Sequence, residues 1–254
     1  MRRILSHLGR ELAALIFPDK CLKCGTYITN AEAGHLSTSF CTFCTGPALP
    51  VYQPPFCTCC GVPFDTGDTH LCESCLKAPP DIGTARAAFT YQGLIREAVG
   101  LFKYNSRLSL AKPFEACLYE AFTDYFSDVP IDLILPIPLH PAKARKRGFN
   151  QSFLLVRNFR AIYRKRYGQP PPWQVDIQSL VRIKETPTQT GLDIAERERN
   201  LKNAFAWGEG RDIEGKSLLL IDDVFTTGAT CRAAAKTLLD AGAARVDALV
   251  LARA

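Results

Sequence analysis

The sequence predicts an α/β domain with a mostly parallel sheet, preceded by a small cysteine-rich module. The chain has 254 residues, a length that suits one large domain plus a smaller unit. Nine of its 11 cysteines fall between Cys21 and Cys75. After residue 80, apolar strand-like runs alternate with helix-like runs, a pattern that favours a parallel sheet covered on both faces.

An amphipathic helix is expected over residues 1–20. Covering part of the protein's own core is its expected role, and contact with a membrane surface is the alternative, given three arginines in the segment. The spacing that predicts the helix is carried by six apolar residues before Pro18, namely Ile4, Leu5, Leu8, Leu12, Leu15 and Ile16.

The same segment does not have the form of a signal peptide, because Ser6, His7, Arg10 and Glu11 interrupt its apolar run. No run in the sequence approaches the roughly 20 apolar residues of a membrane span. We therefore expect a cytoplasmic protein. In a reducing compartment, regularly spaced cysteine pairs are more often metal ligands than disulfides.

Residues 21–80 are expected to form a zinc-binding module that resembles a double zinc ribbon. Little in this segment could form a core, so metal must hold it together. Two-residue spacing lets both sulfurs of a pair reach one ion, and two pairs complete a tetrahedral structural site. The eight expected ligands of two zinc ions are Cys21 and Cys24, Cys41 and Cys44, Cys57 and Cys60, and Cys72 and Cys75.

Two alternatives stay open for these cysteines. Consecutive pairing would give two successive ribbons, whereas interleaved pairing would give a cross-braced module. An iron–sulfur cluster is the rival metal group. Consecutive prolines at Pro79 and Pro80 suit a stiff connector and mark the end of the module.

Residues 81–254 are expected to form the α/β domain. Its first half should contain a strand at 85–91, helices at 94–103 and 111–126, a buried strand at 131–138 and a helix at 151–167. A short strand at 179–183 and a charged helix at 193–203 follow. An apolar strand at 217–221, a helix at 231–241 closed by Gly242, and a strand at 246–251 complete the domain.

Two adjacent carboxylates, Asp222 and Asp223, follow the apolar strand at 217–221. Such a pair is costly at a strand end unless a ligand or a cation uses it. In parallel sheets, ligands bind beyond the carboxyl ends of the strands. The carboxylates could accept hydrogen bonds from two sugar hydroxyls, and the alternative is an acidic pair on the surface.

A small, hydroxyl-rich turn comes next and opens a helix. Because the first amides of a helix have no partner within it and lie at its positive end, a phosphate dianion fits there. An ordinary N-capped helix is the alternative. The turn consists of Thr226, Thr227, Gly228, Ala229 and Thr230.

The run from Leu218 to Thr230 resembles the signature of type I phosphoribosyltransferases, which bind 5-phosphoribosyl 1-diphosphate (PRPP). Nearly the whole chain resembles the ComF/GntX family of competence-associated phosphoribosyltransferase-like proteins. Besides the cysteine pairs, the resemblance rests on Phe-Lys-Tyr at 102–104, Arg-Gly-Phe-Asn-Gln at 147–151, Thr-Gln-Thr at 188–190 and the run at 197–205. It implies a type I phosphoribosyltransferase-like sheet.

The resemblance also implies roles for particular residues. Asp222 and Asp223 would hold the ribose hydroxyls, and the turn at 226–230 would hold the 5-phosphate. Diphosphate with Mg²⁺ would lie near the loop after the strand at 131–138, where the candidates are His140, Arg145 and Arg147. A hood at 182–200 would close over the leaving group, and its candidates are Arg182, Lys184 and Arg197. Neither catalytic residues nor an acceptor can be assigned.

The segment at 133–175 contains no acidic residue and nine lysines and arginines between residues 143 and 166. A polyanionic partner or a solvated basic helix face would explain it. Phe149, Phe153, Phe159 and Tyr163 lie among these charges and could stack on single-stranded DNA, or could form a core face.

Two hypotheses follow for the function of the protein. The first is a phosphoribosyltransferase with an unknown acceptor. The second is a non-catalytic PRPP- or nucleotide-binding module that binds DNA and competence-machinery proteins during transformation.

Overall fold

The computed structural model describes residues 19–28, 35–46, 49, 51–104, 107–185, 200–208 and 211–254. The helix expected over 1–20 lies outside these ranges except for its last two residues. So do Thr188 to Thr190 and Arg197. Within the described ranges, no helix has the length and apolar character to cross a membrane.

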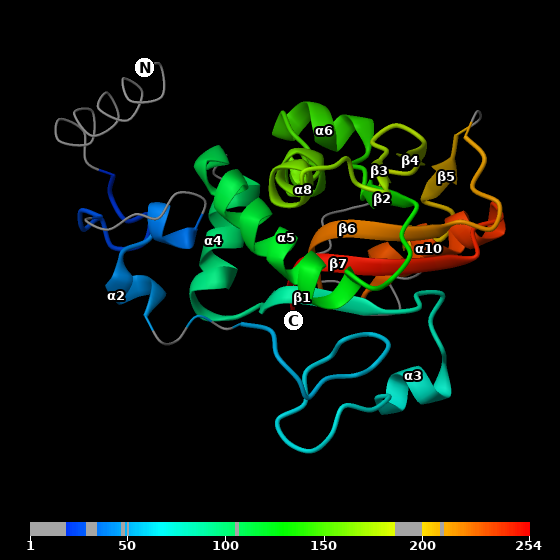
Figure 1. The fold of residues 1–254 in the computed structure, drawn as a ribbon, viewed down its shortest axis with the longest axis horizontal. Coiled ribbons are helices and arrows are strands. Elements are labelled where there is room, and N and C mark those ends of the chain that lie inside the picture. The colour runs from blue at the N-terminus through cyan, green and yellow to red at the C-terminus, as the bar shows by residue number, and fades with distance from the viewer. Residues whose placement is uncertain are drawn as a thin grey trace.

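A five-stranded sheet forms the centre of the larger domain (Figure 1). Its strands lie in the order β1 (Ala85–Thr90), β7 (Arg245–Arg253), β6 (Ser217–Phe225), β2 (Leu133–Pro136) and β3 (Gln174–Val175). Every neighbouring pair is parallel. The predicted α/β class with a mostly parallel sheet is therefore confirmed.

Helices cover both faces of this sheet. On one face, α4 (Gly93–Tyr104), α5 (Ala111–Phe126) and α8 (Phe159–Tyr167) pack against alternate residues of β6 and β7. On the other face, α10 (Ala229–Asp240) packs against the intervening residues. Because both faces are covered, the strands are apolar on both sides, which explains the continuous run at 217–221.

The helix expected at 151–167 is divided into α7 (Gln151–Leu154) and α8. The division follows from a contact with α5. The buried carboxylate of Glu115 accepts hydrogen bonds from the backbone amide and the side-chain amide of Asn158. The backbone amide is therefore bonded to Glu115 at the point where the two helices separate.

Shorter elements complete the fold. Helix α6 (Pro141–Arg147) follows β2 and was not expected from the sequence. The strand expected at 179–183 is β4 (Leu180–Arg182), which pairs with β5 (Phe205–Trp207) in a separate antiparallel ribbon. Among the residues that the structure describes, 3₁₀ turns lie at η1 (Leu36–Thr38) and η2 (Leu108–Leu110).

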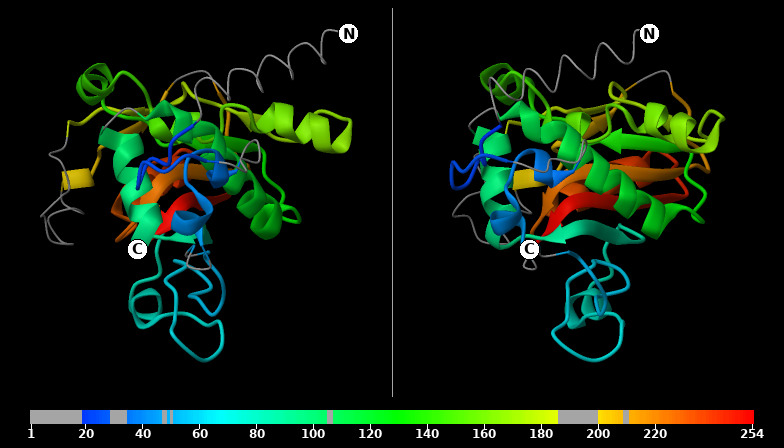
Figure 2. Two further views of the ribbon diagram at one scale, coloured as in Figure 1. Left: turned by 90° about the vertical axis from the view of Figure 1, so that its left-hand side faces the viewer. Right: turned by 60° about the vertical axis from the view of Figure 1, so that its left-hand side comes forward.

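The cysteine-rich segment forms two ribbons of the same design. In each, the first cysteine pair lies between two bridged residues, Lys20 with Tyr27 and Phe56 with Pro63. In each, the second pair begins a short helix, α2 (Thr42–Thr45) or α3 (Glu73–Lys77), with a cysteine as its N-cap. Figure 2 shows the first ribbon in blue beside α4 and the second in cyan below β1.

Candidate functional site

Asp222 and Asp223 lie inside β6, shortly before the strand ends at Phe225. A tight turn then leads into α10. Gly228 makes this turn with φ 78°, a conformation that suits glycine, and α10 begins at the next residue. The hydroxyl of Thr227 accepts a hydrogen bond from the backbone amide of Ala229 at 3.4 Å. The carboxylates and the N-terminus of a three-turn helix therefore share one end of the sheet.

The two carboxylates have different partners. The Lys103 ammonium lies 2.8 Å from Asp223, and their side chains are 19% and 10% exposed. Asp222 accepts hydrogen bonds from the Ser152 hydroxyl at 3.0 Å and from the Asp223 backbone amide at 2.9 Å. Lys103 is therefore the ion-pair partner of Asp223, and hydrogen bonds hold Asp222.

This arrangement changes the acidity of the site. Burial, and next the neighbouring Asp223 carboxylate, raise the pKa of Asp222 to about 7, and Lys103 and the hydrogen bonds only partly oppose this rise. For Lys103, burial lowers the pKa, but the charge of Asp223 and its hydrogen bond outweigh burial, so the pKa is raised. Near neutral pH, Asp222 can therefore exchange its proton while Lys103 stays charged.

A pocket of about 370 Å³ opens in front of these residues. Besides the two aspartates, its lining includes four cationic side chains, Lys103, Lys143, Arg147 and Arg182. Burial, followed by the charges of Arg147 and Arg182, lowers the pKa of Lys143. The like charges of these side chains therefore repel one another, and a bound polyanion would reduce this repulsion.

The structure brings together part of the residue set that the sequence suggested. Thr226, Thr230, Arg147 and Arg182 line the same pocket as the two aspartates. Of the other described candidates, His140 accepts a hydrogen bond from the Ala142 amide as the N-cap of α6, and Arg145 and Lys184 are exposed away from the pocket lining.

Sequence reasoning did not place Lys103, Lys143 or Ser152 in this site. Lys103 stands in the Phe-Lys-Tyr run, and Lys143 was one of nine basic residues in an acid-free segment. Ser152 follows the Arg-Gly-Phe-Asn-Gln run directly. Their position in or next to these runs was the only signal in the sequence. The contact between Ser152 and Asp222 joins residues 70 positions apart, and local spacing does not record such contacts.

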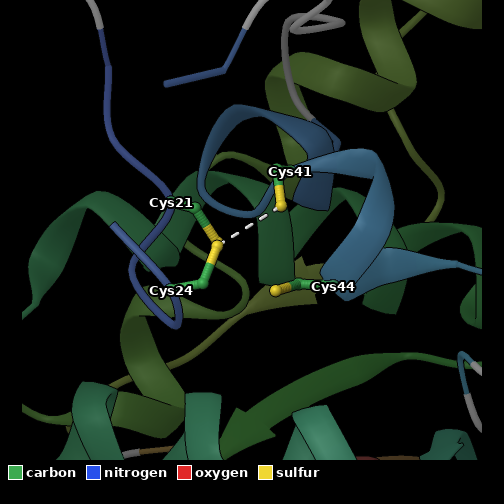
Figure 3. Close-up of side chains that lie close together, drawn as sticks. All are labelled: Cys21, Cys24, Cys41 and Cys44. Atoms are coloured by element: carbon green, nitrogen blue, oxygen red, sulfur yellow. Dashed lines mark hydrogen bonds between the residues drawn. The ribbon is translucent and has the colours of Figure 1, made fainter. Parts of the chain in front are cut away.

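The eight paired cysteines form two clusters, Cys21 with Cys24, Cys41 and Cys44, and Cys57 with Cys60, Cys72 and Cys75. The structure therefore shows the consecutive pairing. Within each cluster the sulfurs lie within 4.8 Å of one another. Figure 3 shows the first cluster, in which the sulfurs of two different pairs converge.

The clusters fit tetrahedral zinc. Bonds of about 2.3 Å place two sulfurs about 3.8 Å apart, and the sulfurs of Cys24 and Cys41 are 3.6 Å apart, those of Cys60 and Cys72 3.7 Å. Gly25 and Gly61 follow the first pairs with φ 75° and 66°, which turns the chain back toward the first cysteine. With four thiolates in each set, these are structural zinc sites.

A mostly parallel α/β domain with an acidic strand end and a threonine turn, preceded by two zinc ribbons, defines a phosphoribosyltransferase-like protein with an N-terminal zinc module. Residues 12–76 match the family described as "Double zinc ribbon domain". The chain belongs to the ComF/GntX family, because relatives with at least 30% identity match it over nearly their whole length.

Among these relatives is the DNA utilization protein YhgH of Escherichia coli O157:H7, 31% identical over 94% of this chain and 99% of the relative. Competence protein F of Haemophilus influenzae is 28% identical over 94% of this chain and 98% of the relative. A solved hypoxanthine phosphoribosyltransferase from Staphylococcus aureus aligns with 57% of this chain and 62% of its own, at 17% identity and a TM-score of 0.29.

Proposed function

We propose that the pocket at the end of β6 binds PRPP with Mg²⁺, and that the protein is a phosphoribosyltransferase whose acceptor is unassigned. One observation carries this proposal. The Asp222–Asp223 pair and the turn before α10 meet four cationic side chains in a single pocket. A ribose that carries phosphate at one end and diphosphate at the other presents hydroxyls to the acids and anions to the remaining groups.

Each part of this ligand has a proposed partner. The 5-phosphate would lie at the N-terminus of α10, where the amides and the hydroxyls of Thr226 and Thr230 are donors. The ribose hydroxyls would donate to Asp222 and Asp223. The diphosphate would lie near Arg147 and Arg182, and Mg²⁺ would supply further charge neutralisation there.

Displacement of diphosphate at the anomeric carbon passes through an oxocarbenium-like state, and negative charge develops on the leaving group. The cations of the pocket would stabilise that charge. Asp222 and Asp223 would orient the sugar. The hood residue Arg197 would add a cation when the site is closed over the ligand.

We propose that this activity belongs to the handling of imported DNA, because the relatives carry competence and DNA-utilization names. The cytoplasm is its proposed location. We also propose the division of the chain at residue 80. The non-catalytic alternative, in which the protein binds single-stranded DNA, is supported by the exposed cations of α8, namely Arg160, Arg164, Lys165 and Arg166. Its proposed stacking rings are less suited, since Phe159 is fully buried and Phe149 and Tyr163 pack on the core.

A diphosphate-release assay with PRPP, Mg²⁺ and a panel of nucleobases tests the proposal. Release that depends on one base class, and that an Asp222→Asn/Asp223→Asn variant loses, would support a transferase. A folded protein that binds PRPP without releasing diphosphate in any mixture would support the non-catalytic alternative.

A further inference from the structure

The second zinc ribbon is bonded to the sheet through three consecutive backbone carbonyls, those of residues 58–60, and the next carbonyl accepts from a residue of the cysteine-rich module itself. Arg86 donates to the Thr58 carbonyl at 3.1 Å, and the Ala85 amide donates to the Cys59 carbonyl at 2.7 Å. Arg253 donates to the Cys60 carbonyl at 3.1 Å, and the Tyr52 hydroxyl to that of Gly61 at 2.7 Å. The loop between two zinc ligands is therefore fixed directly against the domain.

One of these donors, Arg253, also holds the turn that precedes α10. It lies at the end of β7, and its guanidinium donates to the carbonyls of Phe225 at 3.1 Å and Thr226 at 2.8 Å. The same group lies over the Phe225 ring at 5.0 Å. A single rigid, planar group thus joins a zinc-ligand residue to the last residue of β6 and the first residue of the proposed phosphate turn.

The environment of Arg253 explains why both contacts should matter. The side chain is buried, and it donates to the backbone carbonyls of Cys60, Phe225 and Thr226 and to a backbone oxygen of Ala254, the last residue of the printed sequence. A zinc ion held by four thiolates carries two net negative charges, so the loaded second ribbon would place further negative charge beside this cation.

The turn has little freedom to compensate for a shift of Arg253. A Cβ on Gly228 would lie 2.3 Å from the Phe225 ring, so that ring already fills the space behind the turn. Movement of the Phe225 and Thr226 carbonyls would displace Thr226, which lines the pocket. A displaced guanidinium would therefore shift a residue that is proposed to contact the ligand.

We propose that Arg253 is a positioning residue that couples the second zinc ribbon to the phosphate turn. The ribbon holds one edge of the guanidinium, and the guanidinium holds the turn in the shape that receives phosphate. The expected effect on PRPP binding rests on the proposed function. The expected effect on the shape of the turn rests only on the contacts of Arg253. The first ribbon makes no such contact among the residues described and serves as the internal reference.

An Arg253→Gln variant tests the coupling, with Arg86→Gln as its matched control. Both arginines donate to a carbonyl of the same cysteine loop, but only Arg253 reaches the phosphate turn. We expect Arg253→Gln to weaken PRPP binding at least 10-fold and to speed amide hydrogen exchange in peptides covering residues 224–232. Arg86→Gln should change neither quantity. An Arg253→Lys variant, which keeps the charge but not the two-edged geometry, serves if the glutamine variant does not fold.

Coupling is reciprocal, so ligand should also stabilise the distant metal. We expect PRPP to slow chelator-driven zinc release in one of two kinetic phases of the wild type, and to have no such effect in the Arg253 variant. A role confined to general stability would not produce that difference. Exchange at 224–232 that is unchanged in Arg253→Gln or Arg253→Lys, or that rises equally in Arg86→Gln, would overturn the coupling. A wild type that does not bind PRPP would instead refute the proposed ligand, and hydrogen exchange alone would then decide the inference.

Discussion

The Lys103 ammonium and the Asp223 carboxylate lie 2.8 Å apart and join the end of α4 to the end of β6. Without this cation, Asp223 would lose its ion-pair partner, and two adjacent acids would share a confined site with less compensating charge. The pair therefore keeps the site in a form that can receive an anionic sugar.

Replacement of Lys103 by Met should lower the free energy of unfolding by about 1–3 kcal/mol, because a largely buried carboxylate loses its partner. Lys23→Met is the matched control, since the Lys23–Glu97 pair is 3.0 Å long but much more exposed, and such pairs contribute about 0–1 kcal/mol. Urea denaturation of both variants measures the difference. Equal losses of unfolding free energy in the two variants would show that the buried pair contributes no more than the exposed pair.

Asp222 predicts a pH dependence of stability. Its folded pKa of about 7 lies above the unfolded value of 3.8, so the folded state binds the extra proton. Stability should therefore fall as pH rises from 4 to 7, by up to about 1.4 kcal/mol per pH unit from this group, and level off above the folded pKa. Asp222→Asn should flatten that part of the curve in thermal unfolding at a series of pH values. An identical slope in the variant would contradict the raised pKa.

Gly228→Ala should destabilise the protein by more than the positive φ of this residue alone would explain. The left-handed conformation costs a non-glycine residue about 1–2 kcal/mol, and overpacking against Phe225 adds about 1–3 kcal/mol. Gly168→Ala separates the two effects, because Gly168 has φ 73° and no atom within 4 Å of the added carbon. Denaturant midpoints of both variants provide the comparison. The prediction fails if Gly168→Ala is as destabilising as Gly228→Ala.

Zinc stoichiometry tests the consecutive pairing of the cysteines. The wild type should bind two zinc ions. A Cys24→Ser/Cys41→Ser variant changes two ligands of one cluster and should retain one ion, whereas Cys24→Ser/Cys60→Ser changes both clusters and should lose both. Metal analysis of the purified, folded proteins gives the counts. Interleaved pairing would cost the Cys24→Ser/Cys41→Ser variant both ions.

Much of this molecule could be predicted from local sequence patterns. Cysteine spacing predicted both metal sites, since two-residue pairs carry their own geometry. The apolar run at 217–221 predicted a central strand, although β6 continues to Phe225 and includes both aspartates. Strand and helix alternation predicted the parallel sheet.

Contacts between distant segments could not be predicted in this way. The separation of α7 from α8 depends on Glu115, which is 43 residues away from Asn158. Lys103 meets Asp223, and Arg253 meets Cys60, only because the strand order brings these segments together. No periodicity within one segment records such pairings.

Calorimetric titration of PRPP into the protein with Mg²⁺, beside the Asp222→Asn/Asp223→Asn variant, tests the central claim most directly. We predict saturable binding to the wild type and its loss in the variant, because the two carboxylates would accept the ribose hydroxyls. Absence of heat in both folded proteins at millimolar PRPP, or equal binding by both, would contradict the proposed role of this site.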